Sequence, residues 1–259
     1  NEQEEVDLNK QSEEENELAI EESNNKSLQQ ANLDNPTSHQ TPEDSNLLDI
    51  SQISGVDHEE ITEYNKLISE TSNTENFLED KSFPHGESSL TADLSKFPVA
   101  KDIQQWRKIS EIYKDIILCG DQFRPQDIQQ GQLEDSHFLS SLSVLATKKK
   151  SVRRLFHLKN VKSPPYYLIW LCDSGVWRAI RVDEYVPSIQ DQPCFSRTKS
   201  GDIWVLLLEK AFAKLFGNYY SIEEGNSAEA LTILTGAPTV IFDREDFKEP
   251  KTEKDDTRK

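Results

Sequence analysis

The chain has 259 residues, of which 35% are hydrophobic, and its formal net charge at pH 7 is −18. That length is ample for one sizeable folded domain, but the hydrophobic fraction is low for a chain that is packed throughout. The sequence has no apolar run as long as a membrane span and no basic stripe that could follow a nucleic-acid backbone. These features exclude nucleic acid as a partner, whereas membrane association and oligomeric state stay open.

The excess of acid is concentrated in the first 57 residues. Residues 1–57 hold 15 Asp and Glu against 2 Lys, a net charge of −13, whereas the other residues hold 32 acids and 27 bases, a net charge of −5. A segment so poor in apolar residues cannot offset its ordering entropy, so we expect residues 1–57 to be disordered, as a partner-binding or autoregulatory tail or as a solvated linker. The dense mixed charge of residues 243–259 predicts a charged tail, so residues 58–242 are predicted to form the folded domain.

The first predicted elements are helical. Four apolar residues at helical spacing predict a short amphipathic helix: Ile61, Tyr64, Leu67 and Ile68. A second helical stretch is predicted from Asp102, as its N-cap, to about Tyr113. Gly120, Asp121 and Pro125 then predict an irregular loop.

Three further elements follow the loop. Apolar residues at helical spacing from Phe138 to Leu145 place Ser136 at a helix N-terminus, with Asp135 as a natural capping residue. Two strand-like runs, Tyr166–Cys172 and Trp177–Val182, are separated by a short turn and predict an antiparallel hairpin. A long apolar face predicts a helix over residues 203–216, with Gly217 as its stop signal.

The segment before Ser136 has the layout of an oxyanion hole. Gln130 precedes Ser136 by six residues and could place its side-chain amide beside it, while the backbone N–H at the helix start supplies a second donor. Two donors beside a nucleophile stabilise the tetrahedral intermediates of acyl transfer. A helix N-terminus would also lower the pKa of a thiol placed there.

The cysteines indicate a reducing compartment. The chain has three, Cys119, Cys172 and Cys194, and no C-x-x-C pair, so neither a disulfide framework nor a zinc site is expected. We expect free thiols in an intracellular, cytoplasmic protein. The chain has no methionine at all, which predicts a fragment or a processed product.

The stretch QQGQLEDSHFLSSLSVLA, Gln129–Ala146, resembles the segment that opens the catalytic helix in the calpain family, where cysteine followed by tryptophan stands at positions 136 and 137. Four other stretches resemble calpain motifs in the same order along the chain: FLEDKSFP (77–84), QWRKISEI (105–112), WRAIRVDEYVPS (177–188) and IWVLLLEKAFAKLFGNYYSIEEGNSAEALTILTG (203–236). The resemblance covers roughly residues 57–242. It implies an α+β, papain-like fold, namely the mostly helical, nucleophile-bearing lobe with a small antiparallel sheet.

The same resemblance implies a calcium-dependent cysteine endopeptidase, acting on protein substrates, that has lost its nucleophile. A serine hydroxyl is far more basic than a thiol and is not usefully ionised by a helix N-terminus. His137 replaces the tryptophan, and its ring should point about 100° away from Ser136 around the helix. The family's general base and asparagine come from a second subdomain that we expect to be absent from this chain.

Three interpretations of Ser136 stay open at this point. The first is an inactive pseudoprotease that serves as a binding or regulatory module for protein partners. The second is a fragment of an active calcium-dependent endopeptidase that carries an engineered Cys-to-Ser change. The third, weaker, is a serine hydrolase completed by a histidine from a missing lobe.

A calcium site is also implied by the resemblance. Its predicted ligands are the carboxylates of Asp127 and Glu229 and backbone carbonyls near Gly120 and Gln122, a mixture that suits Ca²⁺. The alternative is that Asp127 caps a turn and Glu229 is a solvated loop acid.

Overall fold

The computed structural model describes residues 58–70, 78–114, 116–118, 123–157 and 164–242. The predicted disordered region, 1–57, and the predicted charged tail, 243–259, lie outside the described residues. Within the described ranges, no helix has the length and apolarity that crossing a membrane would require.

Helices and short antiparallel sheets together confirm the predicted α+β class. The helices are α2 (Glu59–Glu70), α3 (Glu87–Leu90), α4 (Ile109–Ile112), α5 (Ser136–Ala146), α6 (Lys149–Arg153), α7 (Trp204–Leu215) and α8 (Ser227–Thr235), with 3-10 turns η3 (Pro98–Lys101), η4 (Pro125–Asp127) and η5 (Tyr220–Ile222). The strands are β1 (Gln105–Lys108), β2 (Ile128–Gln129), β3 (Tyr167–Asp173), β4 (Val176–Val182), β5 (Tyr185–Ile189), β6 (Gln192–Pro193) and β7 (Arg197–Thr198). They form three sheets in the orders β1-β5-β6, β2-β7 and β3-β4.

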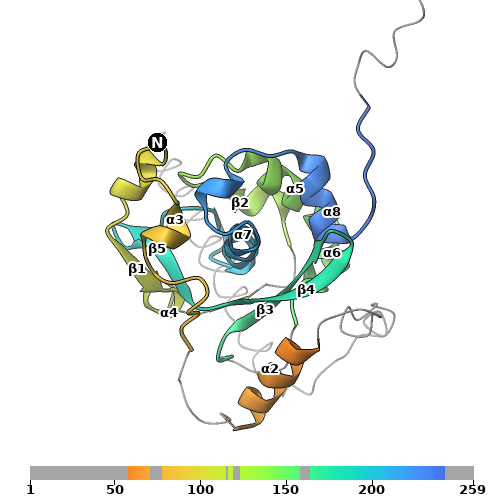
Figure 1. Ribbon diagram of the computed structural model, residues 1–259, viewed down its shortest axis with the longest axis horizontal. Helices are drawn as coiled ribbons and strands as arrows, with labels where there is room; N and C mark the ends of the chain where they lie inside the picture. Colours follow the sequence, from red (N-terminus) through yellow and green to blue (C-terminus); the bar gives the residue numbers. More distant parts are fainter. Residues whose placement is uncertain (1–57, 71–77, 115, 119–122, 158–163, 243–259) are drawn as a thin grey trace, which may run out of the picture. The chain divides into compact units, whose positions relative to one another are not determined.

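Helix α7 is the centre of the core and confirms the helix predicted over 203–216. Every residue from Trp204 to Ala213 is buried, and Gly217 just beyond the helix has a φ of 96° that suits a helix stop. In Figure 1, α7 lies between the β3–β4 hairpin and α5. A helix buried over this length is stable only when other elements cover all its faces.

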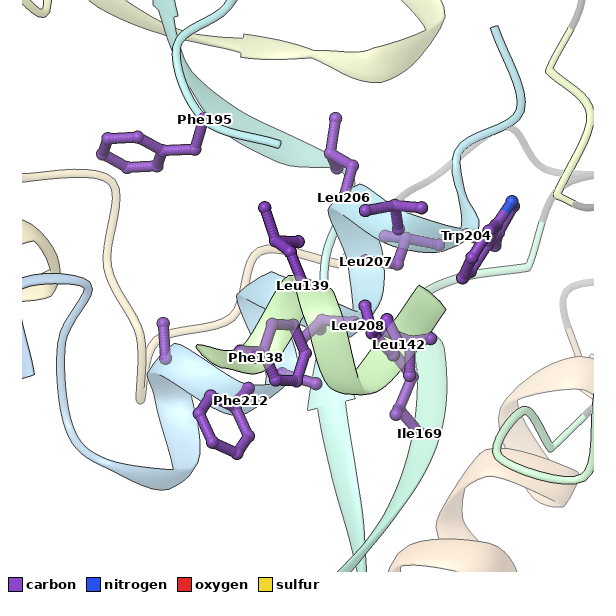
Figure 2. Packing of buried hydrophobic residues seen from close by; sticks show 14 of the residues in the cluster. Phe138, Leu139, Leu142, Ile169, Phe195, Trp204, Leu206, Leu207, Leu208 and Phe212 are labelled. Atoms are coloured by element: carbon purple, nitrogen blue, oxygen red, sulfur yellow. The ribbon is translucent and has the colours of Figure 1, made fainter. Parts of the chain in front are cut away.

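Helix α5, which carries Ser136, packs directly on α7. The rings of Phe138 and Phe212 stack with centroids 4.3 Å apart, and Figure 2 shows these two side chains together with Leu142 between α5, α7 and β3. The opposite face of α5 is open to solvent at Val144. The helix predicted from the spacing of Phe138 to Leu145 is therefore confirmed. Its apolar face fixes the position of Ser136 relative to the core.

The predicted hairpin is confirmed as β3 and β4. Asp173 pairs with Val176, and the two turn residues between them, Ser174 and Gly175, have φ values of 51° and 83°. Positive φ at both central positions is what a two-residue hairpin loop needs to match the twist of its strands.

The predicted N-terminal amphipathic helix is confirmed as α2, which covers the outer face of this hairpin. Ile169 of β3 belongs to the main core, whereas Trp170 packs against Ile61 of α2. Tyr64 makes an edge-on ring contact with Tyr166 at 5.3 Å. Because alternate residues of a strand face opposite sides, β3 is buried on both faces.

The helix predicted from Asp102 to Tyr113 is wrong. Residues Gln105–Lys108 form β1, which pairs antiparallel with β5, and only the short α4 follows. The pairing is extended by backbone bonds from Gln104 N–H to the Ser188 carbonyl (3.2 Å) and from Ile109 N–H to the Glu184 carbonyl (2.9 Å). Helix propensity is a weak preference that a neighbouring strand can override.

Candidate active site

Ser136 is the first residue of α5, as predicted, and its side chain is exposed. The helix begins there because the backbone carbonyl of Asp135 accepts hydrogen bonds from the N–H groups of Phe138 (2.9 Å) and Leu139 (3.1 Å). In the described part of the chain, the Ser136 hydroxyl has no hydrogen-bond partner. The position thus offers an open side chain at the positive end of a helix dipole.

Asp135 does not cap the helix with its side chain, contrary to the sequence-based prediction. Its carboxyl group is buried instead and lies in contact with the carboxyl group of Glu209 on α7. Burial raises the pKa of Asp135 to about 7, and burial together with the Asp135 charge raises the pKa of Glu209 well above its usual range. Sequence reasoning missed this acid pair, although a lone glutamate on the apolar face of a buried helix was a signal for it.

The loop before Ser136 is held by close backbone contacts. Gly131 packs so tightly that a Cβ at this position would lie 2.2 Å from the carbonyl oxygen of Phe195. The N–H of Gln132 donates to the carbonyl of Cys194 (3.0 Å), and β2 just before the loop pairs with β7 just after Ser196. The loop is therefore fixed by the segment around residues 194–198.

Gln130 lies on this loop with its side chain exposed. Its amide nitrogen donates to the backbone carbonyl of Leu133 at 2.7 Å. An amide NH₂ group has two donor hydrogens, so one remains available for another acceptor. A role of Gln130 in an oxyanion hole with Ser136 stays a prediction.

His137, the second residue of α5, packs its ring tightly against the loop before α8 and lies near α7. Its Nε2 would lie 2.4 Å from a Cβ at Gly225, and its ring centroid is 6.4 Å from that of Phe212. Burial lowers the pKa of His137, and the nearby Glu229 partly opposes that shift. The backbone carbonyl of His137 accepts a hydrogen bond from the Ser141 hydroxyl at 2.8 Å.

The residue of α7 that follows Glu209 belongs to a second polar cluster. Lys210 is fully buried and donates to the carboxylate of Asp183, which also accepts from the backbone N–H of Asp80 (2.7 Å) and contacts His85 Nε2 (2.8 Å). Burial alone would raise the pKa of Asp183, but Lys210 and these donors lower it below its usual range. The Lys214 ammonium group in turn contacts Asp80.

The predicted calcium ligands are only partly covered by the described residues. Asp127 ends η4 and is half-buried, while Glu229 lies exposed in the first turn of α8. Gly120 and Gln122 lie outside the described residues. Within the described ranges, no three acidic, histidine or cysteine side chains gather in a way that could hold a metal ion. The calcium site stays a prediction.

Comparison with known proteins gives a consistent result. A sequence model described as "Calpain family cysteine protease" matches residues 78–257. The chain is 32% identical to the calpain-type cysteine protease DEK1 of Zea mays over 166 residues, which is 61% of this chain and 8% of that protein. It is 32% identical to calpain-10 of Mus musculus over 167 residues, and 29% identical to calpain-10 of Rattus norvegicus over 185 residues. These matches cover 61% and 68% of the chain but only 25% and 28% of the two relatives.

Proposed function

This chain belongs to the calpain family of cysteine proteases, and from that premise we propose that it is a pseudoprotease, which retains the family's nucleophile-bearing lobe but acts by binding protein partners. The observation that carries the proposal is Ser136 at the start of α5, where calpains have cysteine. Because the chain spans only 8% to 28% of the relatives described above, both the loss of activity and the binding role are proposals about the whole protein.

The chemistry of the position supports inactivity. A thiol at a helix N-terminus can ionise near neutral pH, whereas a serine hydroxyl needs a hydrogen-bonded general base to become a nucleophile. In the described part of the chain, no histidine is hydrogen-bonded to Ser136. His85 is held by Asp183, and the neighbouring His137 has its ring packed against Gly225.

The buried free thiols Cys172 and Cys194 support the further proposal that the protein acts in a reducing, intracellular compartment. Neither can substitute for the missing nucleophile, because burial raises the pKa of Cys172 and raises that of Cys194 to about 12. A nucleophilic cysteine needs the opposite shift.

The decisive experiment measures casein cleavage with and without calcium by the full-length gene product. Native protein and the Ser136→Ala variant should both be inert, and loss of a nucleophile in such enzymes typically lowers the rate by several orders of magnitude. Calcium-dependent cleavage by native protein that Ser136→Ala abolishes would refute the proposal and favour a serine hydrolase. Cleavage that appears only in Ser136→Cys would show an intact scaffold that lacks only its nucleophile.

A second experiment needs only this chain. In a Cys119→Ser background, Ser136→Cys should react with iodoacetamide faster than Cys172 and Cys194, because it is exposed and lies at a helix N-terminus. The matched control, Ser140→Cys, places an equally exposed thiol one turn further along the same helix. Equal rates for Cys at 136 and 140 would show that the helix start does not activate a thiol.

The alternative is a fragment of an active calcium-dependent cysteine endopeptidase whose cysteine was changed by engineering. The close approaches at Gly131 and Gly225, which keep the loop and α8 tight around the nucleophile position, favour a scaffold that is still fit for catalysis. The codon for residue 136 in the natural gene separates the two proposals, since cysteine there would establish the alternative.

A further inference from the structure

Two neighbouring charged residues of α7, Glu209 and Lys210, are almost completely buried, with 1% and 0% of their surfaces exposed. Lys210 has an opposite charge as its partner in Asp183. Glu209 instead faces Asp135, an acid whose exposed fraction is 0%. Two carboxylates cannot both remain ionised at such close range in a buried place without a counter-charge.

Hydrogen bonding shows what compensates the pair. Both carboxyl oxygens of Glu209 accept from the backbone N–H of Ser196, at 3.0 and 3.1 Å. Apart from its own backbone N–H, no N–H or hydroxyl group of the described residues donates a hydrogen bond to either carboxyl oxygen of Asp135. A buried acceptor without a donor is costly, by about 1–3 kcal/mol per group. A proton on one carboxyl group supplies the missing donor to the other.

Among the described residues, no cationic side chain acts on the pair to replace that proton. Lys210 points to Asp183 and the Tyr185 carbonyl. The titratable groups around the pair and its immediate neighbours are acids or weak acids: Glu134, Glu223, Glu224, Cys194, Tyr219, Asp183 and Asp102. Of these, Glu223 acts directly on Asp135, and its charge makes a second negative charge on the pair less favourable.

The pair lies where three chain segments meet. Asp135 immediately precedes Ser136, and Glu209 is on α7. Ser196, which binds Glu209, is flanked by Phe195 against Gly131 and by β7 paired with β2. A bond between Asp135 and Glu209 therefore joins the start of α5 and its preceding loop to the central helix.

We propose that Asp135 and Glu209 share a proton in the folded chain, and that this proton acts as a pH-sensitive latch that holds the Gln130–Asp135 loop and the first turn of α5 against α7. This goes beyond the pseudoprotease proposal and is independent of it, since the latch does not involve the Ser136 hydroxyl. Above the pH at which the pair loses its proton, repulsion between two carboxylates loosens the nucleophile position before the rest of the core.

The sign of the pH dependence follows from the raised pKa values. A carboxyl group with a higher pKa in the folded than in the unfolded chain binds its proton more tightly when folded. The contribution of the pair is therefore greatest below the ordinary carboxyl pKa of about 4 and is lost as the pH rises toward the folded-state value. The pair loses its protons in two steps: burial raises the pKa of Asp135 to about 7, and Glu209, whose pKa burial raises well above its usual range, holds the shared proton longer.

The test measures the unfolding equilibrium of the 259-residue chain by urea titration from pH 4.5 to 8. For native protein, the pair should raise the unfolding constant by up to about tenfold per pH unit for each proton that only the folded state retains. Glu209→Gln should remove that contribution, because its amide can donate to Asp135 and accept from Ser196 without titrating. The control, Glu87→Gln, removes an exposed acid of α3 that does not act on the pair and should keep the native slope.

Two further measurements guard against a variant that fails to fold. Native protein should show the infrared band of a buried, protonated carboxyl group at pH 6, and Asp135→Asn should lack it. Hydrogen exchange should accelerate at Gln132–Leu139 between pH 6 and 8 beyond its intrinsic pH dependence, and earlier than in the α7 backbone. Absence of the band in native protein, an unchanged pH slope in a folded Glu209→Gln, or stabilisation by metal cations that chelator reverses would each overturn the latch.

Discussion

Two consecutive buried residues of α7, Glu209 and Lys210, belong to different polar clusters. The two clusters compensate buried charge in different ways. Lys210 pairs with Asp183 and is satisfied by opposite charge, whereas Glu209 meets Asp135 and must be satisfied by a proton. The first cluster ties α7 to the segment that joins β4 to β5. The second ties α7 to the loop and helix start that carry Ser136.

The comparison teaches that two consecutive residues of one helix can make a pH-independent contact on one side and a pH-dependent contact on the other. An ion pair between residues of opposite sign stays intact across neutral pH, because both partners keep their charges. Two carboxyl groups attract each other only while they share a proton, and they repel each other once both are ionised. We therefore expect the ion pair between Lys210 and Asp183 to persist near neutral pH, and the Ser136 side to respond.

The largest effect should come from breaking the ion pair on one side only. Lys210→Met leaves the Asp183 carboxylate buried without its cation, which typically destabilises a protein by about 3–5 kcal/mol. The free energy of unfolding by urea measures the change. The double variant Lys210→Met/Asp183→Leu removes both charges and should recover much of the loss. If the double variant is no more stable than the single one, packing of the lysine stem rather than charge dominates.

A smaller loss should follow from disturbing the loop on the other side. Gly131→Ala forces a methyl group to within 2.2 Å of the Phe195 carbonyl oxygen, so the loop or the residue 194–196 segment must move. Overpacking of this kind costs about 1–3 kcal/mol. Gly86→Ala, at a glycine with open space around it, is the matched control. The measurement is the midpoint of urea unfolding, with hydrogen exchange at Gln132 to locate the change.

Sequence reasoning predicted the parts of this comparison unequally. The apolar spacing of α5 and α7 and the glycine after α7 were sufficient to place Ser136 at a helix start and to predict the helix over residues 203–216. That the two helices pack together was not predicted. The 102–113 segment was mispredicted because its strand pairing with β5 depends on residues some 80 positions away. The acid pair was missed for the same reason: the contact between Asp135 and Glu209 is created by packing, and local patterns predict a capping aspartate instead.

A third prediction concerns the acid side of the stability profile. Lys210 and the neighbouring donors hold the pKa of Asp183 below its usual range, so its contribution is present above about pH 4 and is lost as the pH falls through the folded-state value. The loss is at most about 1.4 kcal/mol per pH unit for this one group. Asp183→Asn should reduce the pH dependence of the unfolding free energy, measured with urea, between pH 4 and 2. It should leave the pH dependence above pH 5 unchanged. Glu209→Gln should reduce the pH dependence above pH 5 and leave it unchanged between pH 4 and 2. An effect of both variants in the same pH range would contradict the separation of the two clusters.

The smallest effect on stability is expected at the predicted calcium ligands, which lie outside both clusters. Glu229 is exposed, and within the described residues Asp127 makes its hydrogen bonds through its backbone. Asp127→Ala and Glu229→Ala should therefore change the unfolding free energy in the absence of calcium by no more than about 0.5 kcal/mol. We propose that the same variants abolish calcium binding, since loss of a carboxylate removes both a ligand and a charge from a site of this kind. Isothermal titration of native chain with CaCl₂ should give heat that each variant lacks. Glu224→Ala, at an exposed acid three residues before α8 begins, serves as the control. Unchanged calcium heat in both Asp127→Ala and Glu229→Ala would exclude these residues as ligands.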